Sequence, residues 1–121
     1  MTATDRYLHP EFRKLLGRFE QLLRAKGLHV RITCGYRSLE EQARLYRQRP
    51  RVTRARPGQS PHNWGLAADF CFEGPQPYAG DWETFGRLAK EAGLAWGGGW
   101  LVFKDRPHVE LPNWKQYRGR P

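Results

Sequence analysis

The spacing of the apolar residues changes early in the chain, and this change limits the folds open to it. Between residues 10 and 26, apolar side chains recur every three or four positions, which predicts an amphipathic helix. In residues 28–34 (LHVRITC), apolar and polar residues alternate, which predicts a half-buried strand. Gly27 stands between the two segments, at the position where helices typically end.

A second helix is predicted from Ser38, because Ser38 and Glu41 have the spacing of a capping box. We expect its apolar and aromatic side chains to point inward: Ala43, Leu45 and Tyr46. The segment that follows is rich in Arg and Pro. We interpret it as an exposed basic loop at about residues 47–59 and not as a linker between domains.

The remaining segments complete a pattern of short helices and strands. LAADFCF (residues 66–72) predicts a second strand, and Asp81 predicts the start of a third helix that ends at Gly93. Two short strands follow, LAWGGGWLVF and HVEL, joined by a turn at KDRP. The order predicts an α+β fold, with helices packed on a small, mainly antiparallel sheet. We expect one domain over residues 1–121, with a frayed basic tail at residues 113–121.

Charge and composition narrow the classes of partner. The 121 residues carry a formal net charge of +9, which attracts polyanions such as nucleic acid, anionic lipid or acidic cell-wall polymer. No apolar run approaches the ~20 residues that cross a bilayer. The first residues lack the pattern of a secretory signal, so we expect synthesis in the cytoplasm. Cys34 and Cys71 are interpreted as small buried residues, with a disulfide between them as the less favoured alternative.

Residues of a possible metal site lie in two separate motifs. His62 and Asp69 stand in SPHNWGLAAD, and His108 stands in KDRPHVE. Imidazole and carboxylate groups both suit Zn²⁺, and three protein ligands leave one coordination position open, as in catalytic zinc sites. Asp105 precedes His108 by three residues across a turn, a spacing that can hold a carboxylate near the metal without making it a ligand. Arg37, in GYRS, offers donors for a carboxylate or an oxyanion.

Each of these residues also has a purely structural interpretation. His62 can cap a loop, Asp69 can lie at a strand edge, and His108 can be a buried core residue. Four further residues near the motifs are candidates for contact with substrate or for support of the ligands: Ser60, Trp64, Trp96 and Glu110.

Taken together, the motifs resemble those of the zinc peptidoglycan peptidases. The similar stretches are G-Y-R-S-x-x-E-Q at residues 35–42, S-x-H-x-x-G-x-A-x-D at 60–69, and D-x-P-H at 105–108. This family includes L-alanyl-D-glutamate endopeptidases and D-alanyl-D-alanine carboxypeptidases, and its fold is shared with the hedgehog signalling domain. One departure is Gly99, which follows W-G-G where relatives often carry an acidic residue.

The resemblance implies a role for each motif residue. It implies that His62, Asp69 and His108 bind one zinc ion, that Asp105 is the general base, and that Arg37 contacts substrate or stabilises the tetrahedral intermediate. The function it implies is cleavage of the L-Ala–D-Glu bond of the peptidoglycan stem peptide, most similar to phage endolysins. We expect a monomer that holds the anionic wall or outer membrane through basic residues and acts in the periplasm after release by a holin.

Other functions remain open from the sequence, and one of them is a bacterial cell-wall remodelling enzyme of the same chemistry. A D-alanyl-D-alanine carboxypeptidase would use the same residues. A non-catalytic, zinc-stapled wall-binding module would not need Asp105 beside its metal. A nucleic-acid binder would explain the arginines, but no nucleic-acid-binding motif is recognised, so we expect no specific nucleic-acid partner.

Overall fold

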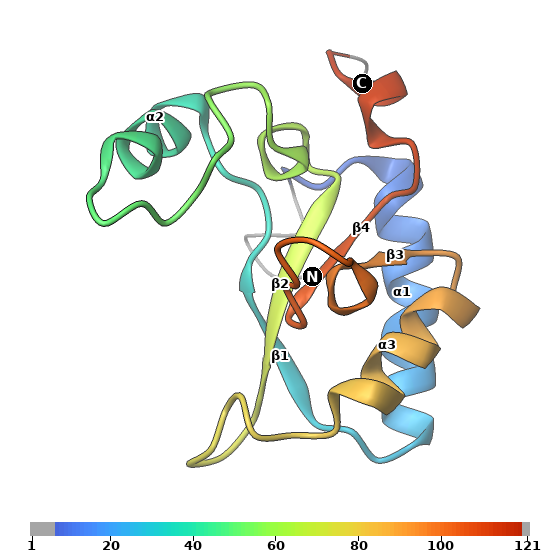
Figure 1. Cartoon of the computed structure of the whole chain (residues 1–121). Helices are drawn as coiled ribbons and strands as arrows, with labels where there is room; N and C mark the ends of the chain where they lie inside the picture. Colours follow the sequence, from blue (N-terminus) through green and yellow to red (C-terminus); the bar gives the residue numbers. More distant parts are fainter. Residues whose placement is uncertain (1–6, 120–121) are drawn as a thin grey trace.

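Four short strands form one antiparallel sheet in the order β1-β2-β4-β3. The computed structural model describes residues 7–119. The main elements are α1 (Pro10–Ala25), β1 (Val30–Cys34), α2 (Leu39–Arg47), β2 (Ala67–Phe72), α3 (Trp82–Glu91), β3 (Ala95–Trp96) and β4 (His108–Glu110) (Figure 1). Short 3-10 turns lie between or after these elements: η2 (Pro61–Trp64), η3 (Gly97–Gly99) and, after β4, η4 (Trp114–Tyr117). The α+β class with an antiparallel sheet is confirmed.

The hydrophobic core lies between the sheet and the pair α1 and α3, which run side by side (Figure 1). Phe19 of α1 packs edge to face against Phe70 of β2 and Phe85 of α3, with ring centroids 5.7 and 5.0 Å apart. The predicted helix ends are confirmed: the Asp81 side chain accepts from the Thr84 amide, and Gly27 has a positive φ of 74° just beyond α1. The sheet therefore has one face fixed by close aromatic packing.

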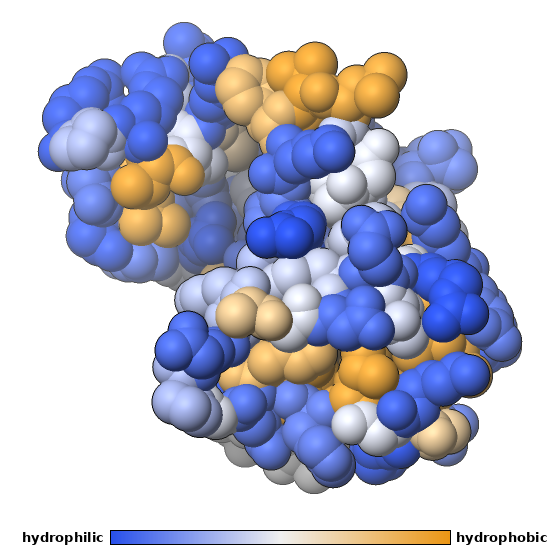
Figure 2. Space-filling view, turned by 60° about the horizontal axis from the view of Figure 1, so that its bottom comes forward, coloured by the Kyte–Doolittle hydropathy of each residue, from blue (hydrophilic) through white to orange (hydrophobic). Residues whose placement is uncertain are grey.

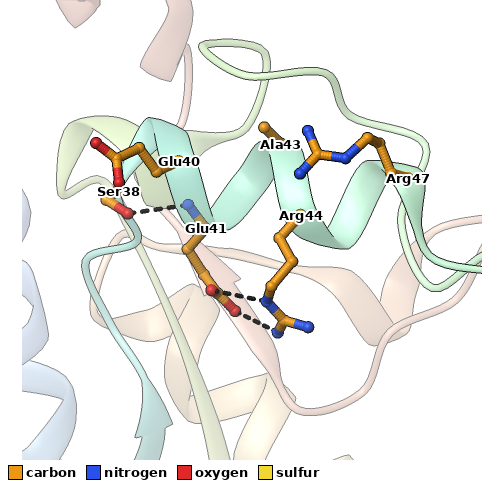
Figure 3. Close-up of a pocket in the computed structure, with 6 residues that line it drawn as sticks. All are labelled: Ser38, Glu40, Glu41, Ala43, Arg44 and Arg47. Carbon is orange, nitrogen blue, oxygen red and sulfur yellow. Dashed lines mark hydrogen bonds and ion pairs between the residues drawn. The ribbon is translucent and has the colours of Figure 1, made fainter.

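Helix α2 stands away from this core, contrary to the inward-facing apolar side that we expected (Figure 1). Ala43, Leu45 and Tyr46 are only half-buried, and the buried residue of α2 is Gln42. The cap at Ser38 is confirmed, because its hydroxyl accepts from the Glu41 amide at 3.0 Å. The Glu41 carboxylate, however, pairs with Arg44 (Figure 3), so the capping-box pattern is only half used.

Several boundaries differ from those expected. Helix α2 includes Arg47, so the basic loop is residues 48–59. The strand expected in LAWGGGWLVF covers only Ala95–Trp96, because the three glycines that follow form the turn η3. Part of the expected frayed tail is ordered, since η4 places Trp114 in the core with 8% exposure, whereas residues 120–121 lie outside the described residues. Both cysteines are free thiols, so the alternative of a disulfide is not found.

No helix among residues 7–119 is long and apolar enough to cross a bilayer.

Candidate metal and catalytic site

The sheet register brings the two metal-binding motifs together. In the antiparallel pairing of β2 with β4, Asp69 lies opposite His108. The turn η2, which carries His62, leads directly into β2. Gly65 makes this connection possible, because it has a φ of 70° and its α-carbon faces the backbone of Tyr7 and His9, where a Cβ would collide. The three sequence-predicted ligands therefore meet at one end of the sheet.

Asp69 is the centre of this cluster. Its Oδ2 lies 3.3 Å from Nε2 of His62, and its Oδ1 lies 2.9 Å from Nδ1 of His108. Both imidazoles are buried, with 4% and 5% exposure, and their ring centroids are 5.3 Å apart. Two nitrogens and a carboxylate from three segments thus converge on one small volume.

Each imidazole is held by its other nitrogen. Nδ1 of His62 lies 2.7 Å from the carbonyl oxygen of Gly35, which can only accept, so that nitrogen carries a proton. Nε2 of His108 lies 2.7 Å from the Glu110 carboxylate and likewise donates to it. In the neutral rings, the nitrogens that face Asp69 then present lone pairs to an anionic oxygen. That arrangement requires a cation between them or a second proton on each ring, so the donor set fits a metal ion such as zinc.

The protonation equilibria of the metal-free cluster follow from the same contacts. Burial disfavours the charged form of His62, but its hydrogen bonds with Asp69 and Cys34 outweigh burial and raise its pKa to about 9. The pKa of His108 is also raised, because Asp69 and Glu110 outweigh burial. The pKa of Asp69 is lowered far below its ordinary value by the same two imidazoles, despite burial. Without a metal, both rings therefore bind a second proton more tightly than a free imidazole does.

Asp105 lies at the rim of the cluster. One of its carboxylate oxygens, one of Asp69 and one nitrogen of His108 all lie within 4.8 Å of one another. Its backbone amide donates to the Gly97 carbonyl at 3.0 Å, and its carbonyl accepts from the His108 amide. Burial is the main cause that raises the pKa of Asp105. A half-buried carboxylate with a raised pKa beside an open cavity is suited to accept a proton.

Arg37 faces the same cavity from the start of α2. Its Nη1 donates to Oε1 of Gln42 at 2.9 Å, and its Nη2 donates to the sulfur of Cys34 at 3.4 Å. Its backbone amide donates to the His62 carbonyl at 2.9 Å, which ties the α2 segment to η2. The guanidinium is thereby fixed at the cavity wall.

A cavity of about 350 Å³ opens over these residues. It is lined by Arg37, Leu45, Val52, Thr53, Ser60, His62, Asp69, Asp105 and His108. Figure 2 shows the hollow between a hydrophilic lobe at the left, which contains α2 and the basic loop, and the rest of the molecule. A separate hollow on the outer surface of α2 is lined by side chains of this helix and its cap, and none of them is a predicted site residue (Figure 3).

The four additional candidates have different positions. Glu110 supports His108 directly, as described above. Ser60 lines the cavity, but its hydroxyl also caps η2 by accepting from the His62 amide at 3.2 Å. Trp64 and Trp96 are not among the residues that line the cavity, and their indole N–H groups donate to the carbonyls of Gly58 and Arg106, respectively. Trp96 thus steadies the turn that carries Asp105 and does not face the cavity.

Two residues that contact the site were missed from the sequence. Gln42 is fully buried and links Arg37 to the basic loop, because its Nε2 donates to the Ala55 carbonyl at 2.8 Å. Its signal was its place in the G-Y-R-S-x-x-E-Q motif, five positions after Arg37. Cys34 lies opposite Asp69 in the β1–β2 register, with its sulfur 3.8 Å from Nδ1 of His62. Strand alternation predicted that Cys34 points inward but not what it touches.

Comparison with known proteins gives consistent relatives. Residues 53–111 match a family described as D-alanyl-D-alanine carboxypeptidase. The chain is 39% identical over 125 residues to the peptidoglycan L-alanyl-D-glutamate endopeptidase CwlK of Bacillus subtilis, covering 88% of this chain and 75% of the relative.

Solved structures share the fold. The L-Ala D-Glu endopeptidase ChiX of Serratia marcescens has a TM-score of 0.71 at 23% identity, over 96% of this chain and 88% of that one. A mutant of the vancomycin resistance D,D-pentapeptidase VanY, in complex with Zn(II), has a TM-score of 0.67 at 16% identity, over 93% of this chain and 79% of that one.

Proposed function

Because this chain belongs to the D-alanyl-D-alanine carboxypeptidase family of peptidoglycan peptidases, we propose that it is a zinc-dependent endopeptidase that cleaves the L-Ala–D-Glu bond of the stem peptide. The observation that carries this is the convergence of His62, Asp69 and His108 beneath a cavity with Asp105 at its rim. The 39% identity to an L-alanyl-D-glutamate endopeptidase supports the choice of bond.

The residues of this chain divide the chemistry between them. His62, Asp69 and His108 would hold the zinc ion, which when bound polarises the scissile carbonyl and makes water more acidic. Asp105 accepts the proton of the attacking water and returns it to the leaving amine, so no net proton is consumed within the cycle. Arg37 directs its guanidinium at the cavity, where it stabilises the negative charge that develops on the carbonyl oxygen.

Digestion of purified peptidoglycan tests the bond assignment. Mass spectrometry of the released fragments is expected to show new N-terminal glutamate and L-Ala left on the glycan strand. Loss of only a terminal D-Ala would instead support the D-alanyl-D-alanine carboxypeptidase alternative. Binding of the wall without any new terminus would support the non-catalytic wall-binding module.

We further propose that the enzyme acts as a phage-type endolysin: a monomer made in the cytoplasm that reaches the periplasmic wall through a holin. The net charge of +9 supports attraction to an anionic wall or outer-membrane surface. Expression in a Gram-negative host is expected to cause lysis only when a holin is co-expressed. Lysis without any holin, or none with it, would contradict this role while leaving the peptidase activity standing.

A further inference from the structure

A second cavity adjoins the metal cavity. It measures about 550 Å³, and it shares Val52, Thr53 and Asp105 with the lining of the first. Its other lining residues come from the basic loop and from the segment after η3: Arg51, Arg54, Ala55, Trp100 and Phe103. Because Asp105, the proposed general base, lines both cavities, the two form one continuous cleft, and a substrate bound at the metal site can extend into the second cavity.

Arg54 and Phe103 meet across this second cavity. The central guanidinium carbon of Arg54 lies over the Phe103 ring, 3.9 Å from its centroid. A guanidinium that rests on an aromatic ring by its face keeps the N–H groups of its edge available for a carboxylate. Within residues 7–119, Arg54 has no carboxylate partner. The pair therefore offers a positioned, solvent-exposed set of donors that a carboxylate can reach.

Phe103 occupies an unfavourable conformation to reach this position. Its φ is 57°, a left-handed value that non-glycine residues seldom adopt, and 61% of the residue is exposed. Its neighbours Leu101 and Val102 are exposed as well. Strained and exposed apolar residues in the wall of a cleft are typical of binding sites.

We propose that Arg54, held on Phe103, binds the free carboxylate of the substrate's glutamate residue. This inference rests on the proposed function. Glutamate has two carboxyl groups, and only one of them continues the peptide chain, so the other remains free close to the scissile nitrogen. Arg37 is not assigned to it, because the proposed function places its guanidinium at the carbonyl oxygen of the scissile bond.

The test uses two soluble peptides that contain the L-Ala–D-Glu bond and differ in one group. The free glutamate carboxylate of the first is a carboxamide in the second. The wild-type enzyme is expected to have a kcat/KM roughly 10-fold higher for the carboxylate peptide, as for one charge-assisted hydrogen-bonded pair. Arg54→Gln should bring the ratio of the two kcat/KM values close to one while leaving cleavage of the carboxamide peptide within about two-fold.

Arg56→Gln is the matched control. Arg56 is an exposed arginine of the same loop, but it donates to the Tyr46 hydroxyl at 3.2 Å and does not line the second cavity. We expect it to keep the wild-type ratio, and Phe103→Leu to lower the ratio because it removes the platform under Arg54.

Three results would overturn the inference. A wild-type ratio in Arg54→Gln would show that another group binds the carboxylate, and equal cleavage of both peptides by the wild type would show that none does. Neither result affects the proposed function. A wild-type enzyme that cleaves neither peptide would overturn the proposed function, and this inference with it.

Discussion

At the scale of single residues, the site depends on what each side chain does with its second polar atom. The nitrogens of His62 and His108 that do not face Asp69 are held by the Gly35 carbonyl and the Glu110 carboxylate. These hydrogen bonds fix the orientation of both rings. Removing one of the hydrogen-bond partners would therefore misorient a metal ligand while leaving that ligand in the chain. Asp105 differs, because burial and nearby charges shift its pKa while no hydrogen bond from the described residues contributes, which leaves the carboxylate able to exchange protons.

Asp105→Asn should therefore abolish turnover but not the fold. The amide cannot accept the proton of the attacking water, a contribution worth about 10²–10⁴ in rate. Zinc content and the melting temperature should remain those of the wild type. His62→Ala, by contrast, should lose bound zinc as well as activity. Wild-type cleavage of a stem peptide by Asp105→Asn would show that the base is another residue.

The stability of the metal-free protein should depend on pH through His62. The contacts with Asp69 and Cys34 raise its pKa from an ordinary 6.5 to about 9. A group whose pKa is raised on folding stabilises the folded state fully below pH 6.5 and loses that effect as pH rises through about 9. Urea unfolding of chelator-treated protein should show a falling free energy of unfolding across this window.

His62→Gln provides the control for this pH dependence, because glutamine does not titrate. Its free energy of unfolding should change less between pH 6.5 and 9 than that of the wild type. Identical pH profiles for the two proteins would show that His62 does not carry the effect.

At the scale of elements, the helices and strands predicted well from the sequence are those in which the apolar periodicity matches the face that is buried in the fold. Helix α1 and strand β2 lie within one residue of the predicted ranges, because their apolar periods match the faces they bury. The inward-facing apolar side predicted for helix α2 is wrong: its apolar residues line the cleft wall or the surface, and the residue it buries is the polar Gln42. No periodicity reveals a buried amide whose partners, Arg37 and Ala55, lie on either side of it in sequence.

The site could be predicted as a set of residues but not as a geometry. The motif resemblance singled out the three ligands and Asp105, whereas the second cavity depends on how the basic loop folds back toward Phe103. Neither the left-handed conformation of Phe103 nor its contact with Arg54 has a local sequence signal. Long-range loop placement of this kind is decided by tertiary contacts.

The packing of α3 against β3 gives a test at this scale. Gly86 lies under the Trp96 ring, and a Cβ at this position would overlap that ring. Gly86→Ala should therefore destabilise the protein by about 1–3 kcal/mol, although alanine is the better helix former. Gly17→Ala in α1 is the matched control, because nothing lies within 4 Å of its added Cβ, and it should stabilise by about 0.5–1 kcal/mol. Urea denaturation of both variants measures the difference, and equal effects would contradict the packing described.

At the scale of the whole molecule, the charge and the cleft have separable roles. The net charge of +9 spreads over the surface, whereas the metal site itself gathers carboxylates. We expect wall binding to weaken in 1 M salt, where the Debye length falls to about 3 Å, while cleavage of a small soluble peptide changes little. The double variant Arg47→Gln/Arg49→Gln, which alters two exposed arginines outside both cavities, should reduce lysis of whole walls several-fold and leave soluble-peptide cleavage unchanged. Equal losses on both substrates would mean that these arginines serve the cleft.

We propose that three side chains from separate segments form one zinc site at which the L-Ala–D-Glu bond is cleaved. The most direct measurement is titration of zinc into metal-stripped protein while cleavage of a soluble L-Ala–D-Glu peptide is followed by mass spectrometry. We expect no cleavage at the start, a rise in rate that stops at about one zinc per chain, and products that end in L-Ala and begin with D-Glu. Full cleavage by the stripped protein, or products from any other bond, would contradict it.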